Sequence, residues 1–470
     1  MCIWLLLILF GFSIQAQENN PKNVLFIIVD DLRPVLPTYG ANQVVAPNIT
    51  AFADNAVQFN NAFVNIPTCG ASRASILTGI RPTRNYFKKF TTSISNDMPD
   101  AVTFPGLLKD HGYITISNGK ISHNRDDMAH TWSEIWRPKG KYNNQDYVDL
   151  KTSETLEKEG LPGVYPFERL DVADVAYKDG KIANKAVKDL KKLKKLGKPF
   201  LLAVGFLKPH LPFNAPGKYW DYYDEKDIQL PINNTFPKNG PKSAGNWVEM
   251  VKYKGIPKNI KGDVRNAASF TLDTDFAKRL IHGYYACVSY TDAQIGKVLR
   301  TLDELGLSDD TIVVFTSDHG FSLMEHNRWS KHNLFNVENR VPLMIRVPSL
   351  TQKGQSQSYV ELIDLYPTIA ELVGLETPER VEGTSLVQNL KDPSLISKSI
   401  GYSRIWNGDM VVSPNYLYAE WRGEEGGSVY DNMLYDLKAD SLEMNNIADL
   451  PKYRKLVDSL SQQIKFKTVQ

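Results

Sequence analysis

The sequence has little cysteine, no excess of either charge and few long apolar runs. Only 3 of its 470 residues are cysteines, so the chain is not a domain held by a disulfide framework, and nothing in the sequence shows that they pair. Basic and acidic residues number 55 and 53, a net charge of +2, which excludes an overall field favouring nucleic acid. With 42% hydrophobic residues, the chain can bury one large core and a smaller second one.

The longest apolar run stands at the start of the chain. Residues 2–12 are apolar and are followed by a small-x-small pattern that ends at Ala16. The run is too short to span a bilayer comfortably, so we predict a signal peptide over residues 1–16, export to the periplasm or the medium, and no stable membrane insertion. The alternative is a buried N-terminal helix. Cleavage near Ala16 would leave only Cys69 and Cys287.

Patterns of buried strands alternate with patterns of helices along the chain. Uninterrupted apolar runs at residues 23–29, 199–206 and 311–317 predict strands that are covered on both faces. Residues 275–306 and 359–374 have helical periodicity. The alternation predicts an α/β fold, in which a mostly parallel sheet lies between layers of helices.

Polar side chains follow each of these three predicted strands. They are Asp30 and Asp31 after the first, Lys208 and His210 after the second, and Asp318 and His319 after the third. Ligands of such sheets bind beyond the carboxyl ends of the strands, so we expect these side chains to meet at one edge. Carboxylates with one imidazole suit Ca²⁺ or Mg²⁺ better than Zn²⁺. A single Asp-Asp pair is more often a helix cap or a turn, but two such sites together favour a metal site.

The pattern changes near residue 396. Short strand-like segments are followed by a helical pattern over residues 451–466; the segments are 399–405, 416–422 and 432–438. We therefore predict a small antiparallel subdomain over residues 396–470, after a main domain of residues 17–395.

Three further segments have a distinctive composition. Residues 139–168 and 230–266 are rich in Pro, Gly, Lys and Asn, which predicts long loops that shape a binding site. The basic run at residues 188–198 has leucines at helical spacing, which favours a solvated helix face over a binding patch.

The stretch PTCGASRASILTG, Pro67 to Gly79, places Cys69 just before a predicted helix. Ser72 can cap this helix and Gly79 ends it. Free backbone N–H groups at the helix start, together with Arg73, would favour a tetrahedral anion. Taken alone, Cys69 would be a small buried hydrophobic residue.

Ordered motifs in the chain resemble a known family. CGASR followed by ASILTG resembles the signature of sulfatases, Cys-x-Pro/Ala-x-Arg with a downstream Leu-Thr-Gly, in which the cysteine is oxidised to formylglycine. NVLFIIVDDLRP, NGKISH, GFLKPHLPF and TSDHGFSLMEHNRWSKH resemble, in the same order, the other blocks of type I sulfatases, closest to the iduronate-2-sulfatase branch. MLYDLKADSLEMNNIAD is similar to the sulfatase tail. The resemblance implies an alkaline-phosphatase-like fold with a small C-terminal α+β subdomain.

The resemblance also implies roles for the matching residues. Formylglycine, made from Cys69 by a maturation enzyme, would attack the sulfur of a sulfate ester as its hydrate, displacing the sugar hydroxyl and leaving an enzyme-bound sulfate ester. Collapse of this ester would expel sulfate and restore the aldehyde. The implied ligands of Ca²⁺, with Mg²⁺ the weaker candidate, are Asp30, Asp31, oxidised Cys69, Asp318 and His319. Arg73, Lys120 and Lys331 would contact the formylglycine or the sulfate. His123, on one helical face with Lys120, would take a proton, and His210 would protonate the leaving alcohol.

The substrate implied by the resemblance is a 2-O-sulfated uronic acid, or a related sugar, at the end of a polysaccharide-derived oligosaccharide such as one from heparan or dermatan, on which the enzyme would act as an exo-sulfatase. Related branches act on algal polysaccharides such as ulvan or carrageenan. A uronate carboxylate needs a cation, and the candidates are Arg84 and Arg328, then Lys331 and, if protonated, His332. Trp329 could stack on a sugar ring or pack in the core, and the same holds for Tyr86 and Trp220.

One residue departs from the commonest signature. Ala71 stands where proline is usual, so conversion of Cys69 depends on which substrates the maturation enzyme of the host accepts.

Two other classes of protein remain open. A phosphatase or phosphodiesterase of the same superfamily would share the metal site, but it usually has Ser or Thr as nucleophile and more His and Asp for a second metal, whereas this chain has 8 His. A non-catalytic polysaccharide-binding protein would keep Cys69 unoxidised.

Overall fold

The computed structural model describes residues 23–139, 146–149, 165–245, 249, 253, 272–348, 350, 352–423 and 427–469. The predicted signal peptide and much of the two predicted long loops lie outside the described residues. Of the helices that are described, none is both long and apolar enough to cross a membrane.

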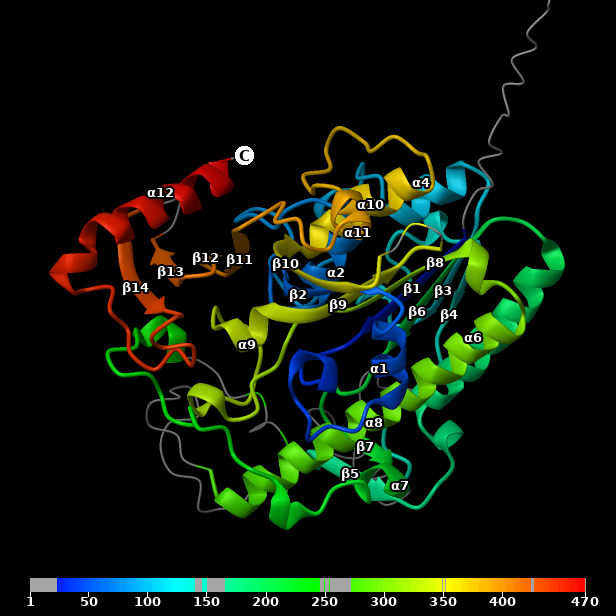
Figure 1. Cartoon of the computed structure of the whole chain (residues 1–470), viewed down its shortest axis with the longest axis horizontal. Helices are drawn as coiled ribbons and strands as arrows, with labels where there is room; N and C mark the ends of the chain where they lie inside the picture. Colours follow the sequence, from blue (N-terminus) through cyan, green and yellow to red (C-terminus); the bar gives the residue numbers. More distant parts are fainter. Residues whose placement is uncertain are drawn as a thin grey trace, which may run out of the picture.

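An eight-stranded sheet forms the centre of the molecule (Figure 1). Its strand order is β10-β2-β9-β8-β1-β6-β3-β4, and neighbouring strands are parallel except that β9 runs antiparallel to β2 and to β8. The predicted mostly parallel sheet is therefore confirmed, and the three predicted strands are β1, β6 and β8. The strands are β1 Asn23–Val29, β2 Val57–Phe63, β3 Ile114–Gly119, β4 Glu134–Trp136, β6 Phe200–Phe206, β8 Thr311–Ser317, β9 Arg340–Arg346 and β10 Gly354–Glu361.

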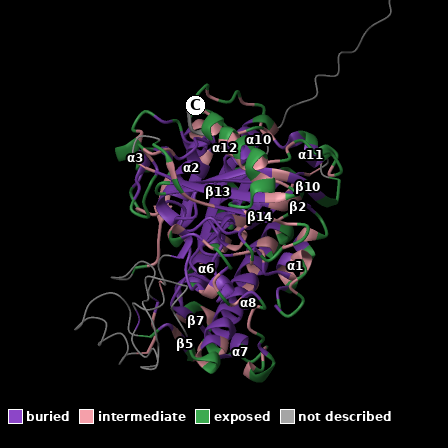
Figure 2. Cartoon of the chain, turned by 90° about the vertical axis from the view of Figure 1, so that its left-hand side faces the viewer, coloured by how far each residue is buried: buried purple, intermediate pink, exposed green. Residues whose placement is uncertain are grey.

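Helices cover both faces of this sheet. Leu25, Ile27 and Val29 of β1 belong to one core cluster, while the alternate residues of β1 belong to a second cluster on the opposite face. The apolar run of β1 is uninterrupted because both faces are buried. The first cluster includes residues of α1 Pro47–Ala53, α6 Lys178–Leu196 and α8 Thr274–Glu304, and the second includes residues of α2 Cys69–Thr78, α4 Phe104–Asp110 and α10 Leu365–Leu372. Figure 2 shows buried residues along the inner sides of these layers.

Two predicted helices have different outcomes. The helix predicted over residues 275–306 is confirmed as α8. The helix predicted over residues 359–374 is wrong in its first part, because β10 continues to Glu361 along β2 and α10 begins only at Leu365. The ladder between β10 and β2 outweighs the local helical pattern of this segment.

A four-stranded antiparallel sheet follows, as predicted for the C-terminal part. Its strands are β11 Gly401–Ile405, β12 Gly408–Val412, β13 Tyr416–Arg422 and β14 Val429–Asp436. β12 is absent from the sequence-based prediction, because its first two residues are poor strand formers. One face of this sheet packs on the second core cluster and the other face lies under α12 Arg454–Val469, at the left of Figure 1.

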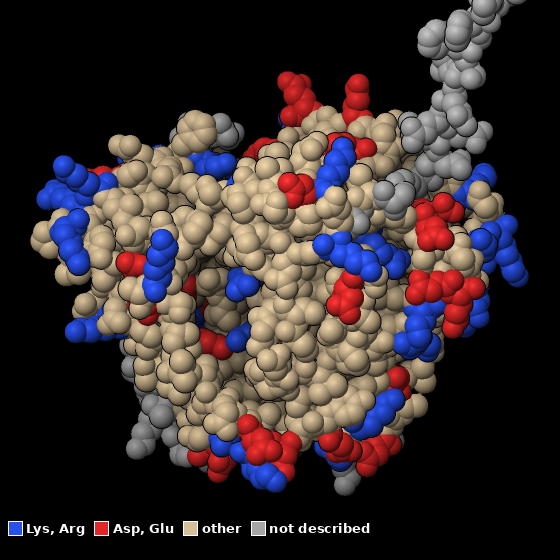
Figure 3. Space-filling view, viewed as in Figure 1, with Lys and Arg blue, Asp and Glu red and all other residues tan. Residues whose placement is uncertain are grey.

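Several short elements connect these layers: β5 Phe167–Leu170 paired with β7 Phe213–Pro216, and the helices α3 Ile94–Asp97, α7 Gly217–Trp220, α9 Asn336–Asn339 and α11 Val387–Lys391. Over most of the face in Figure 3, basic and acidic side chains are interspersed. The basic run at residues 188–198 lies mainly on α6, where Leu190 and Leu193 are buried and the lysines are exposed, as expected of a solvated helix face.

Candidate active site

Four neighbouring central strands, β8, β1, β6 and β3, end at the same edge of the sheet. The six polar residues predicted to meet there do follow these strands: Asp318 and His319 follow β8, Asp30 and Asp31 follow β1, and Lys208 and His210 follow β6. Lys120, which was not part of that prediction, follows β3. Asp31 has a left-handed backbone, with φ of 63°, and its N–H donates to Asp318 Oδ1 at 3.1 Å, which ties the ends of β1 and β8 together.

Helix α2 brings Cys69 to this edge. Thr68 precedes the helix in an extended conformation, Cys69 is its first residue, and Gly79, with φ of 67°, ends it. The prediction that Ser72 caps this helix is wrong, because the helix begins three residues earlier. Ser72 lies in its first turn, where its hydroxyl donates to the Asp318 carbonyl at 2.6 Å.

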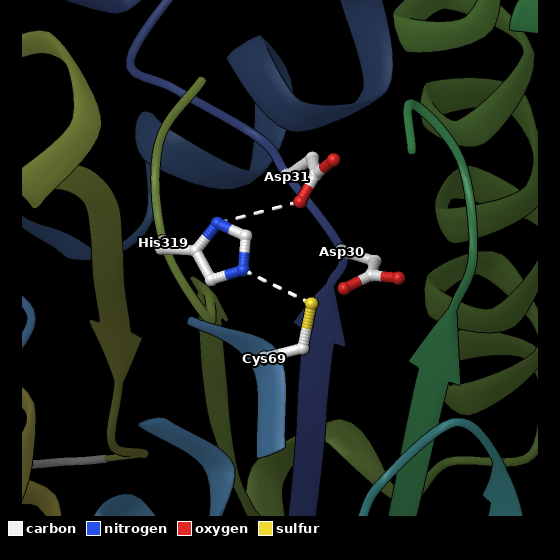
Figure 4. Close-up of side chains that lie close together, drawn as sticks. All are labelled: Asp30, Asp31, Cys69 and His319. Atoms are coloured by element: carbon white, nitrogen blue, oxygen red, sulfur yellow. Dashed lines mark hydrogen bonds and ion pairs between the residues drawn. The ribbon is translucent and has the colours of Figure 1, made fainter. Parts of the chain in front are cut away.

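Four side chains point toward one another at the end of β1 (Figure 4). Ligand atoms of Asp30, Asp31, Cys69 and His319 all lie within 4.8 Å of one another, and all four residues are buried. His319 Nε2 lies 3.2 Å from Cys69 Sγ, and Nδ1 lies 3.3 Å from Asp31 Oδ1. Two buried carboxylates and an imidazole are a donor set that fits Ca²⁺ or Mg²⁺.

The predicted fifth ligand, Asp318, lies beside this group. One carboxylate oxygen accepts the Asp31 N–H, and the other accepts a hydrogen bond from Arg73 Nε at 2.8 Å. Asp318 Oδ2 is nevertheless only 3.8 Å from His319 Nε2. The structure therefore brings all five predicted ligand residues together, with Asp318 held by Arg73.

Three buried cations balance the carboxylates. Arg73 Nη2 lies 3.4 Å from Asp30 Oδ1, Lys120 Nζ donates to Asp30, and Lys331 Nζ donates to both carboxylate oxygens of Asp31 at 2.8 and 2.9 Å. Burial alone would raise the pKa of Asp30, but Lys120, His210 and Arg73 together hold it well below its ordinary value. The site is thus a compact cluster of opposite charges.

The Cys69 thiol lies among imidazole groups. His123 and His210 lie beside it and line the same cavity, in addition to the contact with His319. Burial would raise the pKa of the Cys69 thiol, but Lys331, Lys120 and His319 outweigh it and lower the pKa well below the ordinary value. The predicted shared helical face of Lys120 and His123 is wrong, because residues 120–123 form an irregular segment after β3. Tertiary contacts, not helical spacing, bring them together.

A cavity of about 450 Å³ opens onto Cys69. Its lining comprises Thr68, Cys69, Lys88, Lys89, Phe90, His123, His210, Glu249, Lys331, His332 and Trp406. Sequence reasoning missed Lys88, Lys89, Phe90 and Trp406. The first three belong to the segment NYFKKF shortly after the signature, where two adjacent lysines beside aromatic residues were an available signal.

The three predicted substrate-binding residues do not line this cavity. Arg84 donates to the Gly423 carbonyl and to Asp409. Arg328 is buried against Glu338 at 2.9 Å, so its charge is already balanced, and Trp329 is 1% exposed in the core.

The structure also places three other residues considered for the sugar, His332, Trp220 and Tyr86. His332 lines the cavity, but burial lowers its pKa to about 3, so it is neutral near pH 7 and no cation for a carboxylate. Trp220 is buried in the core, and Tyr86 is partly buried outside the lining.

Comparisons with known proteins agree with the motifs. A family model described as Sulfatase matches residues 22–375, and one described as N-sulphoglucosamine sulphohydrolase, C-terminal, matches residues 324–470. The chain is 34% identical over 533 residues to iduronate 2-sulfatase from Homo sapiens, covering 95% of this chain and 96% of that protein.

Two solved structures show the same fold. One, in complex with its substrate D-glucosamine-2-N,6-O-disulfate, has a TM-score of 0.74 at 21% identity and covers 95% of this chain and 97% of its own. The other, a phosphonate monoester hydrolase from Silicibacter pomeroyi, has a TM-score of 0.77 at 21% identity and covers 95% of both chains. Because these two proteins act on different esters, the fold alone does not select between sulfur and phosphorus chemistry.

Proposed function

The chain belongs to the sulfatase family, close to its iduronate-2-sulfatase branch, and on that premise we propose that this sulfuric ester hydrolase removes the 2-O-sulfate from a uronic acid of a polysaccharide-derived oligosaccharide. The observation that supports the site most directly is the meeting of Cys69 with three buried cations and three imidazoles beside one cavity, onto which Cys69 opens. The substrate rests on the identity to the human relative.

Two groups would complete the site. A bound Ca²⁺, held by Asp30, Asp31, Asp318, His319 and the oxidised Cys69, would draw charge from the sulfuryl oxygens. Formylglycine at residue 69, made from Cys69 by a maturation enzyme, would supply as its hydrate the hydroxyl that attacks the sulfur.

The remaining residues would position the ester and move protons. Lys120 and Lys331 are 3% and 2% exposed, and their ammonium groups would bind sulfate oxygens in a site with little water, where such contacts are strong. Arg73 would hold Asp30 and Asp318 in place through its guanidinium group. His210 and His123 both line the cavity beside Cys69, so His210 would protonate the leaving alcohol and His123 would take the proton of the residue-69 hydroxyl when the enzyme-bound ester collapses.

The experiment has two stages. Peptide mass analysis of the exported protein should find an aldehyde at residue 69, and an unmodified thiol in the native host would contradict the proposal. The converted enzyme is then given a panel of sulfated oligosaccharides, together with phosphate diesters. Loss of the 2-O-sulfate from a uronate supports the proposal, whereas activity confined to aryl sulfates, to other sugar positions or to phosphate diesters contradicts it.

A matched pair of variants tests the role of the thiol. Cys69→Ala should abolish sulfate release, while Cys287→Ala should retain it, because Cys287 is buried in α8. A protein that binds the oligosaccharide equally well but never releases sulfate would instead be a non-catalytic binding protein.

Localisation and domain boundaries are part of the same proposal. We expect export directed by residues 1–16, a catalytic domain over residues 17–395 and a subdomain over residues 396–470. N-terminal sequencing of the exported protein tests the first of these expectations.

A further inference from the structure

Among the residues that line the cavity without a role in the sulfate chemistry are two lysines and two exposed aromatic residues, Lys88, Lys89, Phe90 and Trp406. We propose that they form a second subsite, in which the two ammonium groups bind an anionic group of the saccharide other than the reacting sulfate, and the aromatic side chains contact a sugar ring. This inference rests on the proposed function, since it requires a sulfated saccharide as the substrate.

The two lysines differ from the other cations near the site. Lys120, Lys331 and Arg328 are buried and bonded to carboxylates. Lys88 and Lys89 are exposed, and no ion pair or hydrogen bond of their ammonium groups occurs within the described part of the chain. Glu249 is the acidic residue in the lining, and it lies 3.7 Å from Lys331. The positive charge of the two exposed lysines is thus available to an anion that enters the cavity.

The segment that carries the lysines is built against the nucleophile helix. Phe87, fully buried, has a left-handed backbone with φ of 55°, a conformation that a bulky residue rarely adopts, and its N–H donates to Asp97 at 2.7 Å. The Phe90 carbonyl lies against Gly70, where an added Cβ would come within 2.1 Å of its oxygen. Contacts that hold Phe87 in this conformation also fix the direction of the residues that follow it. Backbone strain of this kind is concentrated at binding sites, where it holds side chains in position for a ligand.

The aromatic side chains come from two separate parts of the fold. Phe90 is 55% exposed, and its ring lies 5.9 Å from the ring of His123, edge to face. Trp406 is 47% exposed in the turn between β11 and β12, where its φ is 49°, and its ring lies 6.1 Å from that of His332. Exposed aromatic rings beside a polar site suit the apolar faces of sugar rings.

The arrangement defines a chemical class of substrate. With the sulfate at Cys69, a second anionic group on the same or the neighbouring sugar would reach the lysines, so we expect a preference for saccharides with two negative charges over aryl sulfates with one. A carboxylate and a second sulfate offer the same oxygen chemistry to an ammonium group.

The test compares kcat/KM of the converted wild type and the Lys88→Gln/Lys89→Gln variant on a dianionic saccharide and on a monoanionic aryl sulfate. The ratio of kcat/KM on the saccharide to kcat/KM on the aryl sulfate should be about tenfold lower in the variant than in the wild type, mainly because KM for the saccharide rises. The difference in this ratio between the glutamine variant and the wild type should shrink at high salt. Lys88→Arg/Lys89→Arg should restore the wild-type ratio. Trp406→Ala should also raise KM for the saccharide about tenfold, without this dependence on salt.

The control is Lys194→Gln/Lys195→Gln, which removes another exposed pair of adjacent lysines, on α6. It should match the wild type. Methyl esterification of the uronate and removal of the second sulfate are separate arms, and the one that abolishes the effect of the lysines identifies the anionic group.

Failure of this inference is distinguishable from failure of the proposed function. If the wild type removes sulfate from another sugar position, the uronate proposal is wrong and the lysine test proceeds on the saccharide that is cleaved. If the glutamine variant keeps the wild-type ratio on every dianionic saccharide, or loses activity equally on both substrates, the subsite is overturned.

Discussion

Gly70 follows Cys69 in α2, and we predict that Gly70→Ala displaces one wall of the cavity. The added methyl group would lie 2.1 Å from the Phe90 oxygen and 2.7 Å from the Phe90 carbonyl carbon. Both are backbone atoms, so the wall or the helix start must move by roughly 1 Å to restore a normal contact. Alanine favours the helix by at most about 1 kcal/mol. Forced backbone shifts cost about 1–3 kcal/mol, so we expect a net destabilisation of about 1 kcal/mol.

The larger effect should be on activity. A displacement of this size near reacting groups can lower the rate by about 100-fold. The assay measures kcat/KM on the saccharide that the wild type cleaves and the urea midpoint, in preparations whose aldehyde content at residue 69 is known from peptide mass. Gly423→Ala is the control, since its methyl group would meet nothing within 4 Å. If Gly70→Ala keeps the wild-type midpoint and kcat/KM, the contact with Phe90 does not position the site.

Three further predictions concern buried charges and the metal. Arg73→Met leaves two buried carboxylates without their nearest guanidinium, so urea unfolding should show that the free energy of unfolding falls by about 3–5 kcal/mol. Arg73→Lys should recover part of this stability. A methionine variant as stable as the wild type would show that these ion pairs do not stabilise the fold. Burial raises the pKa of Glu361, but Arg81 and Lys398 lower it to about 2. The stabilising effect of the Glu361 carboxylate is therefore complete above its ordinary pKa of 4.5 and is lost as pH falls toward 2. The free energy of unfolding of Glu361→Gln should depend less on pH in this range, and the same pH dependence in variant and wild type would contradict the lowered pKa. Chelation of the metal should abolish sulfate release and lower Tm, and added Ca²⁺ should restore both. The shift in Tm should be measurable, because a cation present at 1,000 times its Kd stabilises the folded state by about 4 kcal/mol. An unchanged Tm would argue against a resident metal.

Much of the central architecture was predictable because its causes are local. Strands buried on both faces must be apolar throughout, so β1, β6 and β8 stand out in the sequence. The long helix α8 has a periodic pattern of sufficient length. The prediction was wrong for some shorter elements. The segment up to Glu361 has a helical pattern but belongs to strand β10, and β12 was missed because it is short and begins with two poor strand formers.

The sequence by itself determined which chemistry the chain carries. Carboxylates at the ends of buried strands and Cys69 before a helix are set by residue type and order, and parallel topology brings strand ends to one edge. Only the tertiary structure decided how these groups are used. Lys331 and Asp31 are 300 positions apart and meet through the fold, Arg328 is already neutralised by Glu338, and Trp406 reaches the cavity from the C-terminal sheet. Such contacts depend on packing between distant elements, which no local pattern records.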